Sequence, residues 1–219
     1  MKRLIDITFA LVAIALFLPF GSIIMLILRF SGENEIFYRQ TRAGQNGKNF
    51  GLLKFATMLK ESPNLAGGNI TAGSDPRVLP FGTFLRSTKL NEVPQILNIL
   101  VGDMSVVGPR PLTLDVYKLI PEHFRNETKV LKPGLTGVGS IVFRDEEGFI
   151  AQSGMEPMAF YEKEIGPFKG ELELWYLKHQ SLWLDLKIIL LTAWVVLSPN
   201  SDLPGKWLKD LPTHPLFNP

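Results

Sequence analysis

The hydrophobic pattern of the chain is dominated by one segment near its start, where no charged residue occurs from Ile7 to Leu28. At ~1.5 Å per helical residue, this segment is about long enough to cross a hydrocarbon core of roughly 30 Å. It is too long for the apolar part of a secretory signal peptide, and no A-x-A-like cleavage site follows it. Hydropathy alone therefore fits a simple transmembrane anchor.

Two features of this segment favour a different path through the membrane. Pro19 lies in its middle, with Gly21 and Ser22 just behind, and predicts a kinked or broken helix. Basic residues flank both ends: Lys2, Arg3, Arg29, Arg39 and Arg42. The positive-inside rule assigns both flanks to the cytoplasmic side, and Ser22 can help to satisfy the backbone groups that Pro19 frees. We therefore predict a re-entrant, proline-broken membrane helix over residues 1–30 and a domain on the cytosolic face over residues 31–219.

Beyond residue 30 the pattern becomes that of a soluble domain. Short runs of β-type residues occur at Ile36–Arg39 and Phe50–Phe55, and the turn-forming pair Asn46-Gly47 between them predicts a small β-hairpin. Residues 61–75 are mostly turn-formers with almost no periodicity, and they predict a mobile loop. Residues 144–154 are interpreted as a second mobile segment.

A helix is predicted to begin at Asn91, because Asn is among the best helix N-caps and Glu92 would lie at the positive end of the helix dipole. The apolar positions that follow have helical spacing: Val93, Ile96, Leu97 and Leu100. One face of this helix is therefore expected to lie in the core. The helix ends at Gly102, and a short buried strand leads into a proline-locked loop.

The second half of the chain predicts further helices. Residues 121–130 predict a helix, residues 131–140 a glycine-rich loop, and residues 172–197 one or two helices. Four aromatic residues of the last segment suit a membrane interface, although an ordinary core helix fits too: Trp175, Tyr176, Trp183 and Trp194. The N-terminal membrane segment favours amphipathic interfacial helices. The whole pattern predicts a helix-rich α+β monotopic membrane protein.

Composition narrows the chemistry. The 219-residue chain has a net charge of +2 and a pI of about 8.8, and its basic residues form no dense run, so nucleic acid is not an expected partner. The chain has no cysteine, which excludes disulfides and thiolate chemistry, and its three histidines have no ligand-like spacing. No P-loop, dinucleotide fingerprint, H-E-x-x-H motif or serine nucleophile elbow occurs. A covalent nucleophile would therefore be a carboxylate or a hydroxyl.

Several basic residues in turns suggest phosphate binding. Arg110 is held between two prolines, which suits the presentation of a planar fork of donors to a phosphate. Arg86 precedes the helix predicted at Asn91, whose N-terminal N–H groups would add an anion site. Lys54 is a further candidate, and each of these side chains could also serve in a structural salt bridge. Beside a membrane segment, the group indicates a phosphorylated substrate handled at the bilayer surface.

Several stretches, which together cover nearly the whole chain, carry a resemblance to a known family. They are KRLIDI at 2–7, IFYRQTRAGQNGKNF at 36–50, LKFATM at 53–58, the segment 75–111 that ends in GDMSVVGPRP, KPGLTG at 132–137 and SLWLDLKIILLT at 181–192. The GDMSVVGPRP stretch is highly specific. On these residues the chain resembles the bacterial sugar transferases of the monotopic polyprenyl-phosphate phosphoglycosyl transferase family, in the small form with only the catalytic domain.

The resemblance implies a reaction, a cofactor and a location. Such enzymes move a sugar 1-phosphate from a UDP-sugar to membrane polyprenyl phosphate, giving polyprenyl-diphosphate-sugar and UMP in the first membrane step of glycoconjugate assembly. The resemblance implies Mg²⁺ as the cofactor. The implied partners are a UDP-sugar, polyprenyl phosphate and membrane lipids, and the expected form of the lipid phosphate is undecaprenyl phosphate. The resemblance also places the protein at the cytoplasmic face of the bacterial inner membrane, and homo-oligomerisation stays open.

The resemblance also implies roles for single residues. Family members carry an Asp-Glu pair at the start of this helix, where the Asp attacks the β-phosphate of the nucleotide sugar and the Glu helps to hold the metal. Glu92 matches that Glu, and the phosphate-contacting positions are matched by Arg86, Arg110 and Lys54. Asn91 stands where the family has the nucleophilic Asp, and a neutral amide is a poor nucleophile.

Three hypotheses follow from Asn91. Glu92 attacks in its place, or the two substrates react directly in a ternary complex, or the chain is a catalytically disabled member that acts as a lipid-phosphate-binding or scaffold protein. The otherwise matching phosphate site favours an active enzyme. Two further positions depart from the family pattern: Ala56 stands in place of an arginine, and Gly139-Ser140 in place of Ala-Gln.

Overall fold

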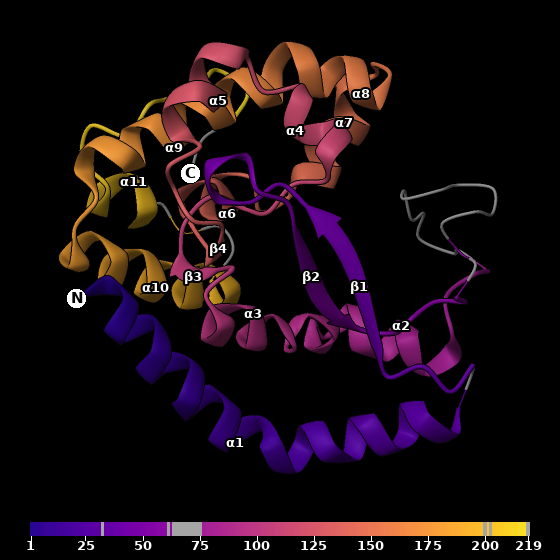
Figure 1. The fold of residues 1–219 in the computed structure, drawn as a ribbon. Helices are drawn as coiled ribbons and strands as arrows, with labels where there is room; N and C mark the ends of the chain where they lie inside the picture. Colours follow the sequence, from indigo (N-terminus) through magenta and orange to yellow (C-terminus); the bar gives the residue numbers. More distant parts are fainter. Residues whose placement is uncertain (32, 61, 63–75, 199–200, 202, 218–219) are drawn as a thin grey trace. The chain divides into compact units, whose positions relative to one another are not determined.

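The computed structural model describes residues 1–31, 33–60, 62, 76–198, 201 and 203–217 (Figure 1). The chain forms two compact units. The first comprises residues 1–3, 41–50 and 102–219, and the second comprises residues 4–40 and 51–101.

The fold is helix-rich α+β. Up to residue 101 the elements are α1 (Lys2–Phe30), β1 (Phe37–Arg42), the 3-10 turn η1 (Gln45–Gly47), β2 (Phe50–Phe55), α2 (Pro80–Ser87), the 3-10 turn η3 (Leu90–Glu92) and α3 (Gln95–Val101). The later elements are β3 (Ser105–Val107), α4 (Leu114–Lys118), α5 (Glu122–Thr128), β4 (Gly134–Thr136), α6 (Val138–Val142), α7 (Glu146–Ser153), α8 (Pro157–Phe160), the π-helical turn η4 (Tyr161–Ile165), α9 (Gly166–His179), α10 (Leu182–Leu197) and α11 (Leu203–Trp207).

The N-terminal segment is one helix, α1, which changes direction in its middle, where Pro19 lies (Figure 1). Of the predicted kink or break, the change of direction agrees with the kink, and the break is wrong because every residue of α1 stays helical through the proline. Pro19 removes one N–H donor, to the Ala15 carbonyl, and the neighbouring turns keep their own bonds. The Ser22 hydroxyl donates to the Leu18 carbonyl oxygen at 2.7 Å and not to Ala15. Such a bond to the preceding turn itself favours a bend in the helix.

Most large apolar side chains of α1 are exposed. Its most apolar stretch has a mean hydropathy of 2.8, and only 6% of that stretch is buried within the protein. Leu16 is 67% exposed and Phe20 66% exposed, whereas Ala10 and Leu28 are buried. A core helix of this composition would be covered by other elements, so the length, hydropathy and exposure of α1 are those expected for contact with lipid.

Strands β1 and β2 form the predicted hairpin (Figure 1). The connection between them is too short for a parallel crossover, so the strands run antiparallel. The turn is made where the sequence indicates it, with positive φ angles of 56° at Asn46 and 73° at Gly47. The Asn46 N–H is bound by the Lys129 carbonyl oxygen at 2.7 Å, which holds the tip of the turn within the first unit.

The side chain of Asn98 connects helix α3 to strand β2 by hydrogen bonds. Its Oδ1 accepts from the Leu53 N–H at 2.9 Å, and its Nδ2 donates to the Gly51 carbonyl oxygen at 2.9 Å. The carboxamide thus provides the hydrogen-bond partners that these two backbone groups of β2 would otherwise find in a neighbouring strand. The predicted core face of α3 is partly wrong, because Leu97 is exposed while Asn98 and Gln95 are buried.

Two segments were predicted to be loops by their composition. Residues 61 and 63–75 of the first lie outside the described residues. The second, residues 144–154, is not a loop, because Glu146–Ser153 form helix α7. The Asp145 side chain caps this helix by accepting from the Gly148 N–H, and Gly154 ends it in the left-handed conformation at φ 64°.

The glycine-rich segment 131–140 contains a strand and the start of a helix, which corrects the predicted loop. Strand β4 pairs in parallel with β3, with Ser105 opposite Gly134 and Val107 opposite Thr136. A Cβ atom at Gly134 would collide with the backbone nitrogen of Gly108. The glycine is therefore needed for close approach of two backbones and not for a flexible turn.

The N-terminal residues of the first unit meet helices α9 and α10 at one buried acid. Asp185, in the first turn of α10, accepts from Lys2 Nζ at 2.5 Å and from the Tyr176 hydroxyl at 2.6 Å, and Lys2 also donates to that hydroxyl at 3.0 Å. The charge of Lys2, which the sequence offers as a membrane flank, is therefore paired inside the fold.

The core of the first unit is aromatic. Phe217 is fully buried, and the rings of Phe143, Phe149, Phe160, Phe168 and His214 surround it. Trp175 and Tyr176 are also buried, so the predicted membrane-interface role is wrong for these two residues. Trp183 and Trp194 on α10 are 65% and 46% exposed and remain available for it.

Candidate active site

Within the second unit, the structure brings Lys54 and Glu92 together. Lys54 Nζ lies 3.7 Å from Glu92 Oε1, and the two side chains are 20% and 26% exposed. Lys54 is supplied by β2 and Glu92 by the turn η3. A partly buried pair of this kind is screened less by solvent than a surface pair, so its charges act more strongly on a nearby ligand.

The turn η3 has a geometry that the sequence did not indicate. Lys89 has the left-handed angles φ 60° and ψ 9°, and the Glu92 N–H donates to its carbonyl oxygen at 3.0 Å. The turn therefore begins before Asn91, and α3 begins only at Gln95. Asn91 does not cap a helix, which corrects the predicted N-cap: its Oδ1 accepts no hydrogen bond from the described residues.

The buried amide of Asn91 is the most unusual polar group of this turn. Asn91 is 8% exposed, and its Oδ1 has no hydrogen-bond partner within the described part of the chain. Such an orphaned acceptor costs about 1–3 kcal/mol and is found mainly where a ligand or a water molecule completes it. Asn91, the sequence neighbour of Glu92, therefore has an acceptor whose hydrogen bonding the described residues leave incomplete.

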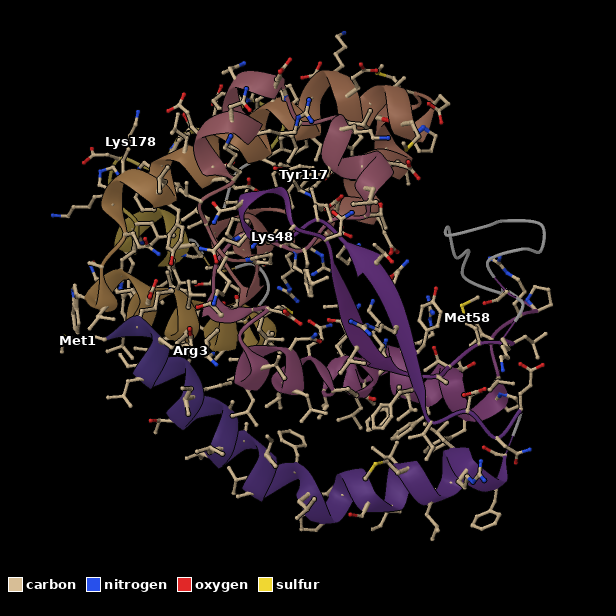
Figure 2. All side chains as sticks on the ribbon, viewed as in Figure 1. Met1, Arg3, Lys48, Met58, Tyr117 and Lys178 are labelled. Carbon is tan, nitrogen blue, oxygen red and sulfur yellow. The ribbon has the colours of Figure 1, made fainter. Side chains whose placement is uncertain are left out.

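The two arginines predicted for phosphate binding lie in different units. Arg86 is in the last turn of α2, in the same unit as Lys54 and Glu92, and its Nη1 lies 3.5 Å from the sulfur of Met58, which Figure 2 labels. Sulfur is a weak acceptor, so this contact leaves the guanidinium able to bind an anion. Arg110 is exposed in the loop after β3 and belongs to the first unit.

A hydrophobic cluster connects the apolar helix α1 to the elements of this site. Ile24 and Leu28 of α1 pack with Phe55 and Leu85, and partly buried side chains complete the cluster: Met25, Ile36, Phe81, Leu90 and Val93. These residues are sequence neighbours of the polar site, because Phe55 follows Lys54, Leu85 precedes Arg86, and Leu90 and Val93 flank the Asn91-Glu92 pair. The cluster therefore packs the segments that carry the charged groups, although not the charged side chains themselves, against the C-terminal half of α1.

The site can hold a metal ion only with help from a ligand. Within the described ranges, no group of three or more His, Asp or Glu residues could bind a metal. Mg²⁺ is commonly bound by one or two carboxylates together with substrate phosphates. Glu92 supplies one carboxylate, so these residues fit a Mg²⁺ ion that is shared with a diphosphate.

Sequence reasoning missed several residues that organise the structure. Asn98 lies on the face opposite the predicted apolar stripe, and its two bonds to β2 involve a strand far away in sequence. Asp185 and Glu173 look like solvent-facing charges in a helical pattern, although Asp185 is buried and Glu173 is partly buried. The signal that could have indicated burial is the local composition, because aromatic residues occur close to both Asp185 and Glu173 in the sequence.

Comparison with known proteins agrees with the sequence resemblance. A family model described as bacterial sugar transferase matches residues 1–199. The uncharacterized sugar transferase EpsL of Bacillus subtilis is 34% identical over 197 residues, which cover 90% of this chain and 87% of EpsL. UDP-glucose:undecaprenyl-phosphate glucose-1-phosphate transferase of Escherichia coli K12 is 35% identical over 196 residues, which cover 88% of this chain and 39% of that protein.

A third relative lies between these two in length. The protein of the same enzyme name from Caulobacter vibrioides is 34% identical over 198 residues, covering 88% of this chain and 68% of the relative. The chain thus spans well under half of the Escherichia coli relative and most of EpsL. With the family model matching nearly its whole length, the chain belongs to the bacterial sugar transferase family.

Proposed function

We propose that this protein transfers a sugar 1-phosphate from a UDP-sugar to polyprenyl phosphate at the cytoplasmic face of the bacterial inner membrane. The products are polyprenyl-diphosphate-sugar and UMP. Family membership and the enzyme names of the relatives support this class of reaction. Undecaprenyl phosphate is the proposed lipid, because it appears in those names.

One observation carries the proposal: the hydrophobic cluster that joins α1 to the Lys54–Glu92 site. A lipid-linked phosphate has its charge at the membrane surface, so the groups that bind it must lie at that depth. Ile24 and Leu28 of α1 pack on Phe55 and Leu85, the neighbours of Lys54 and Arg86. With α1 in the lipid, this packing would hold the two segments that carry Lys54 and Arg86 close to the depth of a polyprenyl phosphate head group.

The proposed reaction is a displacement at the β-phosphorus of the UDP-sugar. A nucleophilic oxygen forms a bond to this phosphorus, the bond from the phosphorus to the oxygen bridging the two phosphates breaks, and UMP leaves with that oxygen. Lys54 and Arg86 would stabilise the negative charge that develops on the phosphates. Asn91 does not attack, because an amide is not a useful nucleophile, and its orphaned Oδ1 would accept a hydrogen bond from a substrate.

Two routes supply the nucleophilic oxygen. In the direct route, polyprenyl phosphate attacks in a single displacement. In the covalent route, a carboxylate oxygen of Glu92 attacks first, and polyprenyl phosphate then displaces the sugar phosphate and restores Glu92. The Lys54 ammonium at 3.7 Å from Glu92 can stabilise charge in either route.

Mg²⁺ is the proposed cofactor, with Glu92 as its protein ligand. When bound, the ion would neutralise charge on the diphosphate and so favour attack at phosphorus. The Asn91 carboxamide and the Glu92 carboxylate both offer oxygen atoms, the ligand type that Mg²⁺ prefers. Isothermal titration with MgCl₂, with and without UDP-glucose, should detect tighter binding in the presence of the nucleotide if the diphosphate shares the ion.

The deciding experiment measures UMP release by the purified protein with undecaprenyl phosphate, Mg²⁺ and UDP-sugars offered one at a time. UDP-glucose is tested first because it occurs in the names of relatives. We expect release with at least one sugar, loss of release in Glu92→Gln, and no change in Glu35→Gln, an exposed acid of the same unit. A phosphosugar adduct on Glu92, found by mass spectrometry, would establish the covalent route.

The competing function is a disabled enzyme that binds a lipid phosphate or acts as a scaffold, and Asn91 is the observation that favours it. The variant Asn91→Asp separates the two. Turnover by the unmodified chain supports the transferase. Turnover that appears only in Asn91→Asp would refute it and identify a disabled site.

A further inference from the structure

The first unit contains a small cavity beside Arg110. Its walls come from helices α4, α5 and α9 and from connecting segments that include the loop after β3, and its lining includes Arg110, Tyr117 (labelled in Figure 2), Thr128, Lys129 and Glu173. The cavity has a volume of about 30 Å³. At roughly 10–15 Å³ for each water molecule, this is room for about two waters, or for two hydroxyl groups in their place.

Glu173 is the acidic group of this cavity, and it has unused hydrogen-bonding capacity. The nearby Thr128 hydroxyl already lies 2.8 Å from the Phe124 carbonyl oxygen and has a single proton to donate. A carboxylate has about four acceptor positions, so this one shared donor leaves most of them open. Burial raises the pKa of Glu173 to about 7, and the neighbouring Lys169 and Thr128 only partly oppose the shift, which marks a poorly solvated carboxyl group.

The rim of the cavity has the opposite charge. Arg110 and Lys129 are exposed there, and Arg110 is held by the prolines on either side of it. Two cationic groups at an open rim suit a phosphate. The phosphate itself would not enter the cavity, because the volume is too small and the Glu173 carboxyl lies inside.

We propose that this cavity binds a vicinal diol attached to a phosphate, with the hydroxyl groups donating to Glu173 and the phosphate resting on Arg110 and Lys129. The ring that carries the diol would stay at the opening, because the cavity has room only for its two hydroxyl groups. The assignment rests on the proposed function, since a UDP-sugar carries diols in its ribose and in its transferred sugar.

The test is equilibrium binding of soluble fragments to the full-length protein in detergent. The probes are UMP, 2′-deoxy-UMP, glucose 1-phosphate and inorganic phosphate. We expect UMP or glucose 1-phosphate to bind, and Glu173→Gln to weaken that binding at least tenfold while binding of inorganic phosphate changes less than twofold. If the diol is the ribose, 2′-deoxy-UMP will bind as weakly to the unmodified protein as UMP binds to Glu173→Gln.

The matched control is Glu171→Gln, which changes an exposed acid on the same helix and should bind every probe as the unmodified protein does. A single cooperative thermal transition in Glu173→Gln would show that the variant is folded. The subsite is refuted if neither diol phosphate binds, or if Glu173→Gln binds both as well as the unmodified protein.

Binding and turnover answer separate questions. Transfer activity together with unchanged probe binding in Glu173→Gln would refute the subsite and leave the proposed function standing. Diol-selective binding without transfer to any lipid acceptor would support the subsite and count against the proposed function.

Discussion

The ammonium nitrogen of Lys54 lies 3.7 Å from a carboxylate oxygen of Glu92, joining strand β2 to the turn η3. Neither residue is conspicuous in the sequence by itself, since one is a lysine in a strand and the other follows an apparent helix cap. Together they form a partly buried pair of charges beside the orphaned amide of Asn91. This pairing is what makes the turn a candidate active site.

Replacing Lys54 by Met should lower kcat/KM for UMP release by about 10- to 100-fold, because hydrogen bonds to charged groups contribute roughly 1.5–3 kcal/mol. The control is Lys60→Met in the exposed Lys60–Glu35 pair of the same unit, where the two side chains are 65% and 45% exposed. Exposed pairs contribute about 0–1 kcal/mol, so activity there should stay within about fivefold. Equal losses in both variants would contradict a role for Lys54 in the site.

Replacing Asn98 by Leu should destabilise the protein by about 2–4 kcal/mol, because the Leu53 N–H and the Gly51 carbonyl would both lose their partner. In a chain of this size, that corresponds to a fall in Tm of roughly 5–15 °C. Thermal unfolding followed by circular dichroism measures it. Asn126→Leu, at an exposed position of α5, is the control and should leave the midpoint nearly unchanged.

The pKa of Glu173 predicts how stability depends on pH. It is raised from 4.5 to about 7, chiefly by burial, and Lys169 and Thr128 oppose the shift. Between these values the folded protein keeps a proton that the unfolded chain releases, so stability falls as pH rises from about 4.5 to 7. At about 1.4 kcal/mol per unit, and discounted for partial exposure, the loss is about 2 kcal/mol.

This loss can be isolated by measuring Tm at pH 5 and pH 8 for the unmodified protein and for Glu173→Gln, which carries no titrating group at that position. The ionisable side chains coupled to Glu173 are Lys169, Tyr117 and Tyr161. They are present in both proteins, so the difference between the two slopes belongs to Glu173. Parallel slopes would disprove the raised pKa.

The re-entrant path of α1 is predicted from its basic flanks and from Pro19. Because the chain has no cysteine, single cysteines at Met1 and Ser31 can each be labelled without background. Both should react with an impermeant maleimide only from the cytoplasmic side, as should Thr213→Cys, an exposed position outside α1. Labelling of the two ends from opposite sides would identify a spanning helix instead.

The features that could be read from the sequence depend on neighbours along the chain. The apolar run predicts α1 because helix length and hydropathy are local properties. The Asn46-Gly47 pair predicts the hairpin, because few other residues adopt positive φ angles so readily. The candidate site residues could also be named from the sequence, because their motifs are recognised by residue spacing along the chain and require no interatomic distance.

Predictions from composition were wrong at two places, where the backbone takes a different conformation. Asn91 has the composition of a cap, but the left-handed Lys89 starts the turn earlier and leaves its amide unpaired. Residues 144–154 resemble a loop, but the Asp145 cap and the aromatic contact between Phe149 and Phe217 accompany a helix there.

By itself, the sequence determined the apolar helix, the hairpin turn, the family and the identity of the charged residues. Only the tertiary structure decided that Lys54 pairs with Glu92, that Asn98 completes the edge of β2, and that Lys2 and Tyr176 converge on Asp185. The physical reason is that hydropathy and turn geometry act over a few residues. Hydrogen bonds and ion pairs of buried groups instead depend on which distant segments folding brings within about 3–4 Å.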